Sequence, residues 1–144
     1  MLYTSFVRSK LDYGAIIWNP YYSVRSQCIE LVQKKFALYS INFSIPIPSY
    51  ENRCRLIHLE TLSNRRLKCS VLFLYKLICG FIDCPALLSC INFHAPSRQL
   101  RHNDFFHMSM HRYNYSSFEP ILRYQREFNC ISTTLDIDFS FNTQ

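Results

Sequence analysis

Glycine is scarce in this sequence, which has only Gly14 and Gly80 among its 144 residues. A sandwich or barrel built from many hairpins needs more glycine, because tight hairpin turns place residues at positive φ. A glycine-rich phosphate-binding loop is excluded for the same reason. No apolar run reaches the roughly 18 residues of a membrane-spanning helix. Since 49% of the residues are nevertheless hydrophobic, these absences predict a mainly α-helical protein with a packed core and no membrane partner.

The cysteine pattern shows no disulfide or zinc framework. The seven cysteines are an odd number and no secretory leader precedes them, so we expect free thiols in an intracellular, nuclear or cytoplasmic compartment. Two sets of residues come nearest to a zinc site, and neither contains the short cysteine pair typical of one. These sets are Cys84, Cys90 and His94, and His102, His107 and His111. We therefore predict no bound metal and no cofactor.

Signatures of catalysis are missing as well. The only close pair of carboxylates is formed by Asp136 and Asp138, near the C-terminus. Metal-assisted nucleotidyl transfer needs carboxylates that converge on two ions about 4 Å apart, and no nearby residue completes such a site. The pair is interpreted as part of a solvated acidic tail over residues 131–144. No local signature of a Cys–His nucleophile is present either, so we predict no catalytic residue and no small-molecule substrate.

Apolar residues recur at helical spacing over residues 2–18, and again from Ser23 or Val24 to Ser40. Asn19-Pro20 separates the two helices, because proline pushes the residue before it out of the α conformation. In the first helix an ion pair is expected between Arg8 and Asp12, which are four residues apart. The expected apolar faces consist of Tyr3, Phe6, Val7, Leu11, Tyr13, Ile17 and Trp18 in the first helix, and of Cys28, Ile29, Val32, Phe36 and Tyr39 in the second.

The clearest helix is predicted between Thr61 or Ser63, either of which can cap it, and Gly80 at its C′ position. Its apolar stripe consists of Leu67, Val71, Leu74, Tyr75 and Ile78.

Three shorter helices are also predicted, over 50–57 with Ser49 as its N-cap, from Asp83 or Cys84 to about Ile91, and over 116–129. The chain is thus expected to form a helical bundle at 1–80, a helical or irregular segment at 81–130 and the acidic tail at 131–144.

Positive charge is concentrated in the N-terminal half. The net charge is +6, and residues 1–76 hold eleven Lys and Arg against four Asp and Glu. Clustered cations bind phosphate backbones without any sequence code, although an ordinary solvated surface explains the composition equally well. Arg65 and Lys76 lie three helical turns apart and are expected on one solvent-facing strip. The candidate nucleic-acid contacts are Lys34, Lys35, Arg53, Arg65, Arg66, Lys68 and Lys76.

Five segments follow one another between about residues 2 and 130: LYTSFVRSKLDYGAIIWNPYY, IELVQKKFALY, YENRCRLIHLETLSNRRLKCSVLFLYKLICG, DCPALLSCINFHAPSRQLR and HRYNYSSFEPILR. In order and spacing they resemble the C-terminal part of non-LTR retrotransposon reverse transcriptases, and in particular the jockey-like elements of arthropods. The resemblance implies a thumb-like helical bundle at 2–80, followed by an irregular C-terminal segment. It also implies weak, non-specific binding of template–primer nucleic acid, beside the palm of the polymerase.

The family's polymerase motif, an aromatic residue followed by x-Asp-Asp, is absent from the sequence, and so is its endonuclease domain. The resemblance therefore implies a non-catalytic fragment of an RNA-directed DNA polymerase, with Met1 as the fortuitous start of a truncated reading frame. Cysteines at 28, 69, 79 and 90 stand where the family is expected to have polar residues, as in a decaying copy. Two alternatives remain: a helical protein-interaction module that docks an acidic partner, and a translated remnant without a function.

Overall fold

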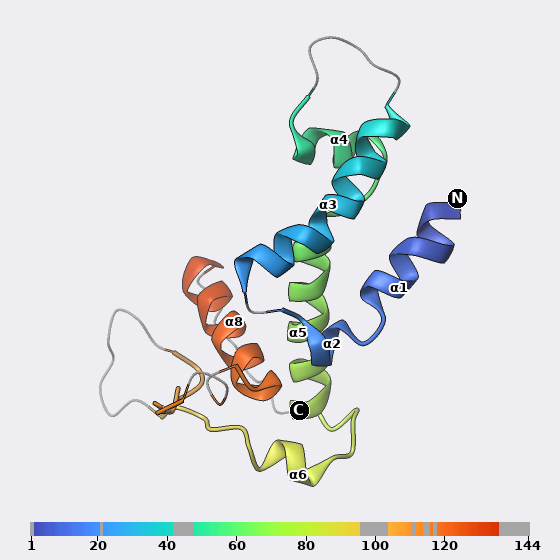
Figure 1. Ribbon diagram of the computed structural model, residues 1–144. Helices are drawn as coiled ribbons and strands as arrows, with labels where there is room; N and C mark the ends of the chain where they lie inside the picture. The colour runs from blue at the N-terminus through green and yellow to red at the C-terminus, as the bar shows by residue number, and fades with distance from the viewer. Residues whose placement is uncertain are drawn as a thin grey trace. The chain divides into compact units, whose positions relative to one another are not determined.

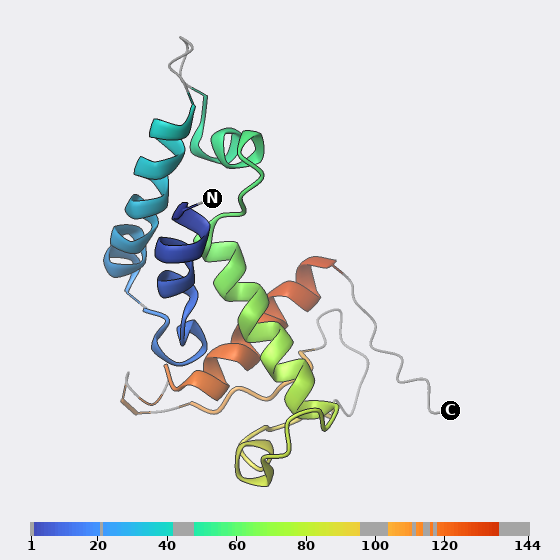
Figure 2. The ribbon, with the colours of Figure 1, turned by 90° about the vertical axis from the view of Figure 1, so that its right-hand side faces the viewer.

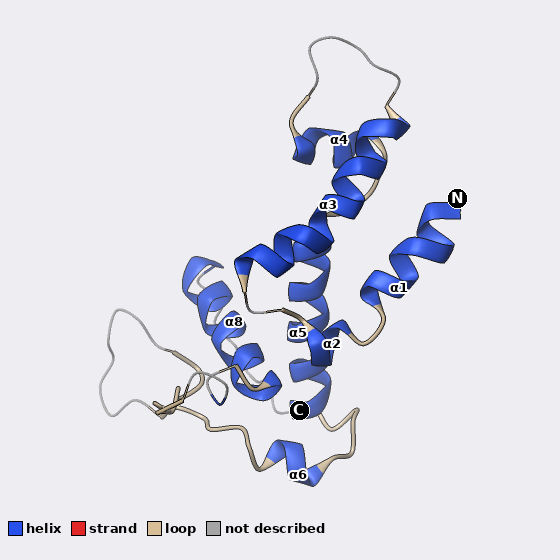
Figure 3. Ribbon diagram, viewed as in Figure 1, coloured by secondary structure: helices blue, strands red, loops and turns tan. Residues whose placement is uncertain are grey.

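The computed structural model describes residues 2–20, 22–41, 48–95, 104–110, 112–113, 116 and 118–135. This part of the chain is mainly helical, as predicted (Figure 3). Its only β pairing is a bridge between Phe93 and Phe106. None of its helices is both long enough and apolar enough to cross a membrane. The helical segments are η1 (Tyr3–Arg8), α1 (Ser9–Asp12), α2 (Ala15–Trp18), α3 (Ser23–Ser40), α4 (Tyr50–Leu56), α5 (Leu62–Ile78), α6 (Pro85–Leu88) and α8 (Pro120–Leu135), and Figure 1 labels those from α1 to α8.

The chain forms two compact units, Met1–Cys69 and Ser70–Gln144, which we call the first and the second unit. The division falls inside α5, so the first half of this helix belongs to the first unit and the second half to the second. The sequence favoured a boundary after residue 80, where α5 has already ended.

The N-terminal helix is broken, whereas the sequence predicted one helix over residues 2–18. Tyr13 is extended, and Gly14 takes the left-handed conformation with φ +65°. Glycine adopts this conformation without the steric cost that a side chain would add. The chain therefore starts again as α2, which ends at Trp18 before Asn19-Pro20, as predicted.

The caps of α4 and α5 confirm the predicted helix starts. The Ser49 hydroxyl accepts a hydrogen bond from the Asn52 amide at 3.4 Å, and Thr61 Oγ1 accepts one from the Asn64 amide at 3.3 Å. Gly80 follows α5 with φ +74°. Its amide donates to the Leu77 carbonyl, and the Phe81 amide donates to the Lys76 carbonyl at 2.9 Å, which closes a Schellman motif.

In the first unit, α3 turns a polar face inward, which contradicts the apolar face predicted for it. Glu30, Gln33 and Ala37 are buried, whereas Val32 and Tyr39 of the predicted face are exposed. The helix packs beside α4 (Figure 2). Ile29 and Phe36 of the predicted face are half-buried, and the Phe36 ring stacks on that of Tyr3 with the ring centroids 3.9 Å apart.

The second unit is built on α8, which is longer than the predicted helix over 116–129 and continues to Leu135. Asn129 binds the backbone of Phe106 on both sides: its Oδ1 accepts from the amide at 3.2 Å, and its Nδ2 donates to the carbonyl at 2.9 Å. Tyr124 packs edge-on against Phe73 of α5. The first part of the predicted acidic tail is therefore helical, and residues 136–144 lie outside the described part of the chain.

Candidate nucleic-acid interface

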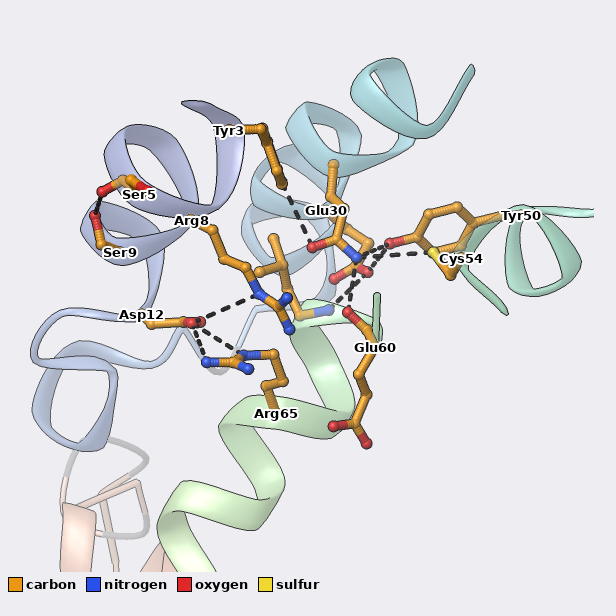
Figure 4. Close-up of polar contacts among 12 residues, drawn as sticks. Tyr3, Ser5, Arg8, Ser9, Asp12, Glu30, Tyr50, Cys54, Glu60 and Arg65 are labelled. Carbon is orange, nitrogen blue, oxygen red and sulfur yellow. Dashed lines mark hydrogen bonds and ion pairs between the residues drawn. The ribbon is translucent and has the colours of Figure 1, made fainter. Parts of the chain in front are cut away.

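A buried polar cluster, formed by Glu30, Gln33, Tyr50 and Arg66, joins the helices of the first unit. Glu30 is only 6% exposed. Its Oε1 accepts hydrogen bonds from the Tyr50 hydroxyl and from the Leu62 amide, the latter at 3.1 Å, and its Oε2 accepts one from the Ser63 hydroxyl at 3.1 Å. This carboxylate of α3 is thus bound to α4 and to the first turn of α5 (Figure 4).

Gln33 lies one turn further along the buried face of α3 and is fully buried. Its Nε2 donates to the Tyr50 hydroxyl at 3.2 Å and to the Glu60 carbonyl at 2.8 Å. Its Oε1 accepts from the Tyr3 hydroxyl at 3.5 Å, so the cluster also reaches η1. The polar cluster fixes the positions of the helices that carry the basic side chains of this unit.

Burial shifts the pKa of two members of the polar cluster. Burial, reinforced by the hydrogen bond to Glu30, raises the pKa of Tyr50 far above its usual value, so the phenol stays a neutral donor. Burial lowers the pKa of Arg66, and the nearby Glu30 carboxylate opposes this shift.

Arg66 does not lie on the predicted solvent-facing strip, because it is only 4% exposed. Its Nη2 donates to the Ser26 hydroxyl at 3.0 Å and lies 3.8 Å from Glu30 Oε2. At that distance the guanidinium balances the charge of a buried carboxylate, so it stabilises the interior of the unit. The surface role predicted for Arg66 was wrong.

Two further candidates on α5 have acidic partners within the unit. Arg65 holds Asp12 Oδ2 through Nη2 at 2.5 Å and Nε at 2.9 Å, and the predicted Arg8–Asp12 pair is present at 3.9 Å (Figure 4). Lys68 is exposed, with its Nζ 2.6 Å from Glu60 Oε1.

Once these pairs are formed, the first unit retains a large excess of positive charge. It holds ten Lys and Arg against four Asp and Glu, and Glu51 is its only acid without an ion pair among the described residues. The second unit holds six of each sign, so the net charge of +6 belongs entirely to the first unit. The cations of the first unit that form no ion pair with a described residue are Lys10, Arg25, Lys34, Lys35, Arg53 and Arg55.

A cleft of about 560 Å³ lies among α3, α4 and the start of α5, and Lys34 and Arg55 both line it. Lys34 Nζ lies 5.3 Å from the centroid of the Tyr50 ring, within range of a cation–π contact. Lys35 is exposed on α3 and Arg53 is half-buried on α4. The structure therefore places three candidate cations, Lys34, Lys35 and Arg53, on one pair of packed helices, together with Arg55, which was not among the candidates.

The remaining candidates are placed differently. Lys76 is exposed in the last turn of α5 and belongs to the second unit. Lys10 and Arg25 are exposed cations of the first unit that the sequence did not single out. No local sequence pattern identifies them. Whether a cation is available to bind phosphate depends on which acids pair with other cations in the folded unit.

No metal site emerges from the described residues. The seven cysteines are free thiols, as expected, and no group of three His, Cys, Asp or Glu side chains in the described ranges is placed to hold a metal ion. Four residues of the sets considered from the sequence lie outside those ranges: His102, His111, Asp136 and Asp138.

Comparisons with known proteins add no relative. No protein-family model matches the chain, and neither the curated proteins nor the solved structures give a match.

Proposed function

We propose that the first unit binds template–primer duplexes through their phosphate backbone, without sequence preference, as the thumb-like part of a non-LTR retrotransposon reverse transcriptase fragment. In this proposal the chain binds the duplex and does not catalyse polymerisation. The observation that supports it is the set of six cations of the first unit that form no ion pair with a described residue, against one such acid.

The physical argument is electrostatic. A cation that already holds a carboxylate gains little from a phosphate, because it must exchange one anion for another. A cation without such a partner releases condensed counterions from the duplex, and this release drives binding that is independent of sequence. Lys34 and Arg55 line one cleft together with Glu30, Glu51 and Glu60. Glu30 and Glu60 already hold Arg66 and Lys68, so the cleft offers a phosphate two cations against one acid without an ion pair among the described residues. Because the five ordered segments resemble those of reverse transcriptases, we take the polyanion to be a template–primer duplex.

The first prediction tests this surface with the double variant Lys34→Gln, Arg55→Gln in the full chain. We expect it to bind a 20-base-pair RNA–DNA hybrid more weakly than the parent, and equally so for two unrelated sequences. The slope of log affinity against log salt should fall in magnitude by up to about two units, since each lost phosphate contact removes about 0.9. Fluorescence anisotropy of the labelled hybrid measures both quantities.

The matched control is Lys76→Gln, Arg112→Gln, which removes the same charge from exposed cations of the second unit. Its affinity and salt slope should stay close to those of the parent, and circular dichroism checks that both variants fold. Equal losses in the two double variants would place binding outside the first unit. A salt slope unchanged in the first variant would remove Lys34 and Arg55 from the interface.

A further inference from the structure

The face of α3 that points away from the polar cluster is exposed and mostly apolar, with Lys35 among its apolar side chains. The rotation of the helix is fixed, because Glu30 and Gln33 are held inward by hydrogen bonds to α4 and to the start of α5. Turning the helix to bury its apolar side would expose these bonds and leave Arg66 without its carboxylate. The outer face of α3, defined by its apolar members, consists of Val24, Cys28, Leu31, Val32 and Tyr39.

The outer face of α3 has the spacing of a helix-binding surface. Tyr39 is 77% exposed, Val24 69% and Leu31 48%, and the separations of four, seven and fifteen residues along the face put its members on one side of a helix. From Val24 to Tyr39 the face is about 22 Å long at 1.5 Å per residue. That length accommodates about four turns of a partner helix.

The charges on this side of α3 have one sign. Arg25 and Lys35 are exposed and fall on the same half of the helix as the outer face. Glu30 is the only acid in α3, and it is buried on the opposite side. A partner that covers the outer face therefore meets apolar side chains beside two cations and no acid.

We propose that the outer face of α3 is a docking surface for an acidic amphipathic helix of a partner protein. Such a helix covers the apolar side chains with its own apolar stripe and brings Asp or Glu to Arg25 and Lys35. A nucleic acid satisfies only the cations and leaves the apolar side chains in water. A second copy of this chain brings another first unit of net charge +6 to the same place. Charge complementarity thus selects an acidic partner.

The second prediction tests this surface with two designed 21-residue peptides, both with Leu at heptad positions a and d. One carries Glu at positions e and g, and the other carries Lys there. We expect the acidic peptide to bind the full chain at least tenfold more tightly than the basic one, measured by anisotropy of the labelled peptide. The variant Leu31→Ser, Tyr39→Ser should bind the acidic peptide at least tenfold more weakly than the parent.

The matched control is Leu56→Ser, Tyr13→Ser, which removes the same side-chain types from positions 64% and 84% exposed elsewhere in the first unit. It should bind the acidic peptide within about twofold of the parent, and its circular dichroism spectrum should match those of the parent and of the first variant.

Four outcomes overturn the proposal. The first two are equal binding of the two peptides and equal losses in the two variants. The third is a dimer, seen by sedimentation, that dissociates in Leu31→Ser, Tyr39→Ser, because a second copy then covers the face. The fourth is binding to phosphatidylserine vesicles, but not to the acidic peptide, with the same sensitivity to that variant. Hybrid-duplex affinity is measured on the same variants and should not change in Leu31→Ser, Tyr39→Ser, so this test and that of the duplex proposal fail independently.

Discussion

At the residue scale, the position of Glu30 has the clearest energetic consequence. A carboxylate that is buried loses its hydration, and this cost is offset only by charged and hydrogen-bonding partners. Glu30 has Tyr50, the Leu62 amide and Ser63 as hydrogen-bond donors, and Arg66 as a buried countercharge. Removing the carboxylate therefore leaves the Arg66 guanidinium buried without its acid.

The third prediction is that Glu30→Ala lowers the free energy of unfolding by about 3–5 kcal/mol, the usual effect of breaking a buried ion pair. Glu30→Gln should lose less, because an amide oxygen still accepts hydrogen bonds. Urea denaturation followed by circular dichroism measures these differences. The control, Glu51→Ala, removes an exposed acid from the same unit and should stay within about 0.5 kcal/mol of the parent. A Glu30→Ala variant as stable as Glu51→Ala would show that the polar cluster contributes nothing to folding.

At the scale of elements, the end of α5 depends on a conformation that suits glycine. The Gly80 amide and the Phe81 amide satisfy the last carbonyls of the helix only while Gly80 is left-handed. A Cβ at residue 80 would meet no atom within 4 Å. A side chain at residue 80 would therefore cause no steric clash with other residues, and its energetic cost would come only from the left-handed backbone conformation.

The fourth prediction is that Gly80→Ala destabilises the chain by about 1–2 kcal/mol, the cost of a left-handed residue with a side chain. Gly80→Asn should cost less, because asparagine tolerates this conformation. Thermal unfolding by circular dichroism compares both with Cys79→Ala, which changes the exposed neighbour without touching the left-handed residue. Unfolding of Gly80→Ala at the parent's temperature would mean that the Schellman motif does not stabilise α5.

Local signals predicted most of the element boundaries, and non-local contacts decided what the sequence missed. The caps of α4 and α5 and the stop at Asn19-Pro20 depend on neighbouring residues, so the sequence contains them. The rotation of α3 depends on what α4 and α5 present to it, here a tyrosine hydroxyl, backbone amides and an arginine. The periodicity of apolar side chains predicts which face of a helix is buried only when the helix packs against an apolar surface. It does not predict burial against a polar surface such as this one.

The same distinction holds for the candidate interface. The sequence supplied the cations, but their availability depends on acids far along the chain. Asp12 is 53 residues from Arg65, and no pattern indicates that the two meet. Lys34 and Arg55 became a pair of candidates only when α3 and α4 packed together around one cleft.

At the scale of the whole molecule, the two proposed surfaces respond differently to salt. The net charge of +6 belongs to the first unit, and the second unit is neutral overall. Binding of a duplex by phosphate contacts is driven by counterion release and weakens steeply as salt rises. Docking on the outer face of α3 rests mainly on apolar burial, which screening does not remove, and only its contribution from Arg25 and Lys35 is screened.

The fifth prediction follows from this difference and requires titrations of the parent chain at 50 and 200 mM NaCl. If the four cations that form no ion pair with a described residue and lie outside the outer face of α3 (Lys10, Lys34, Arg53 and Arg55) contact phosphates, the hybrid duplex should bind about 10²-fold more weakly at the higher salt, and less for fewer contacts. The acidic peptide should lose less than tenfold over the same range, since at most two cations face it. Anisotropy of each labelled probe against one protein preparation gives both slopes. A duplex affinity that does not change with salt would contradict phosphate binding. If log affinity for the peptide fell as steeply with log salt as that for the duplex, apolar docking on α3 would be contradicted.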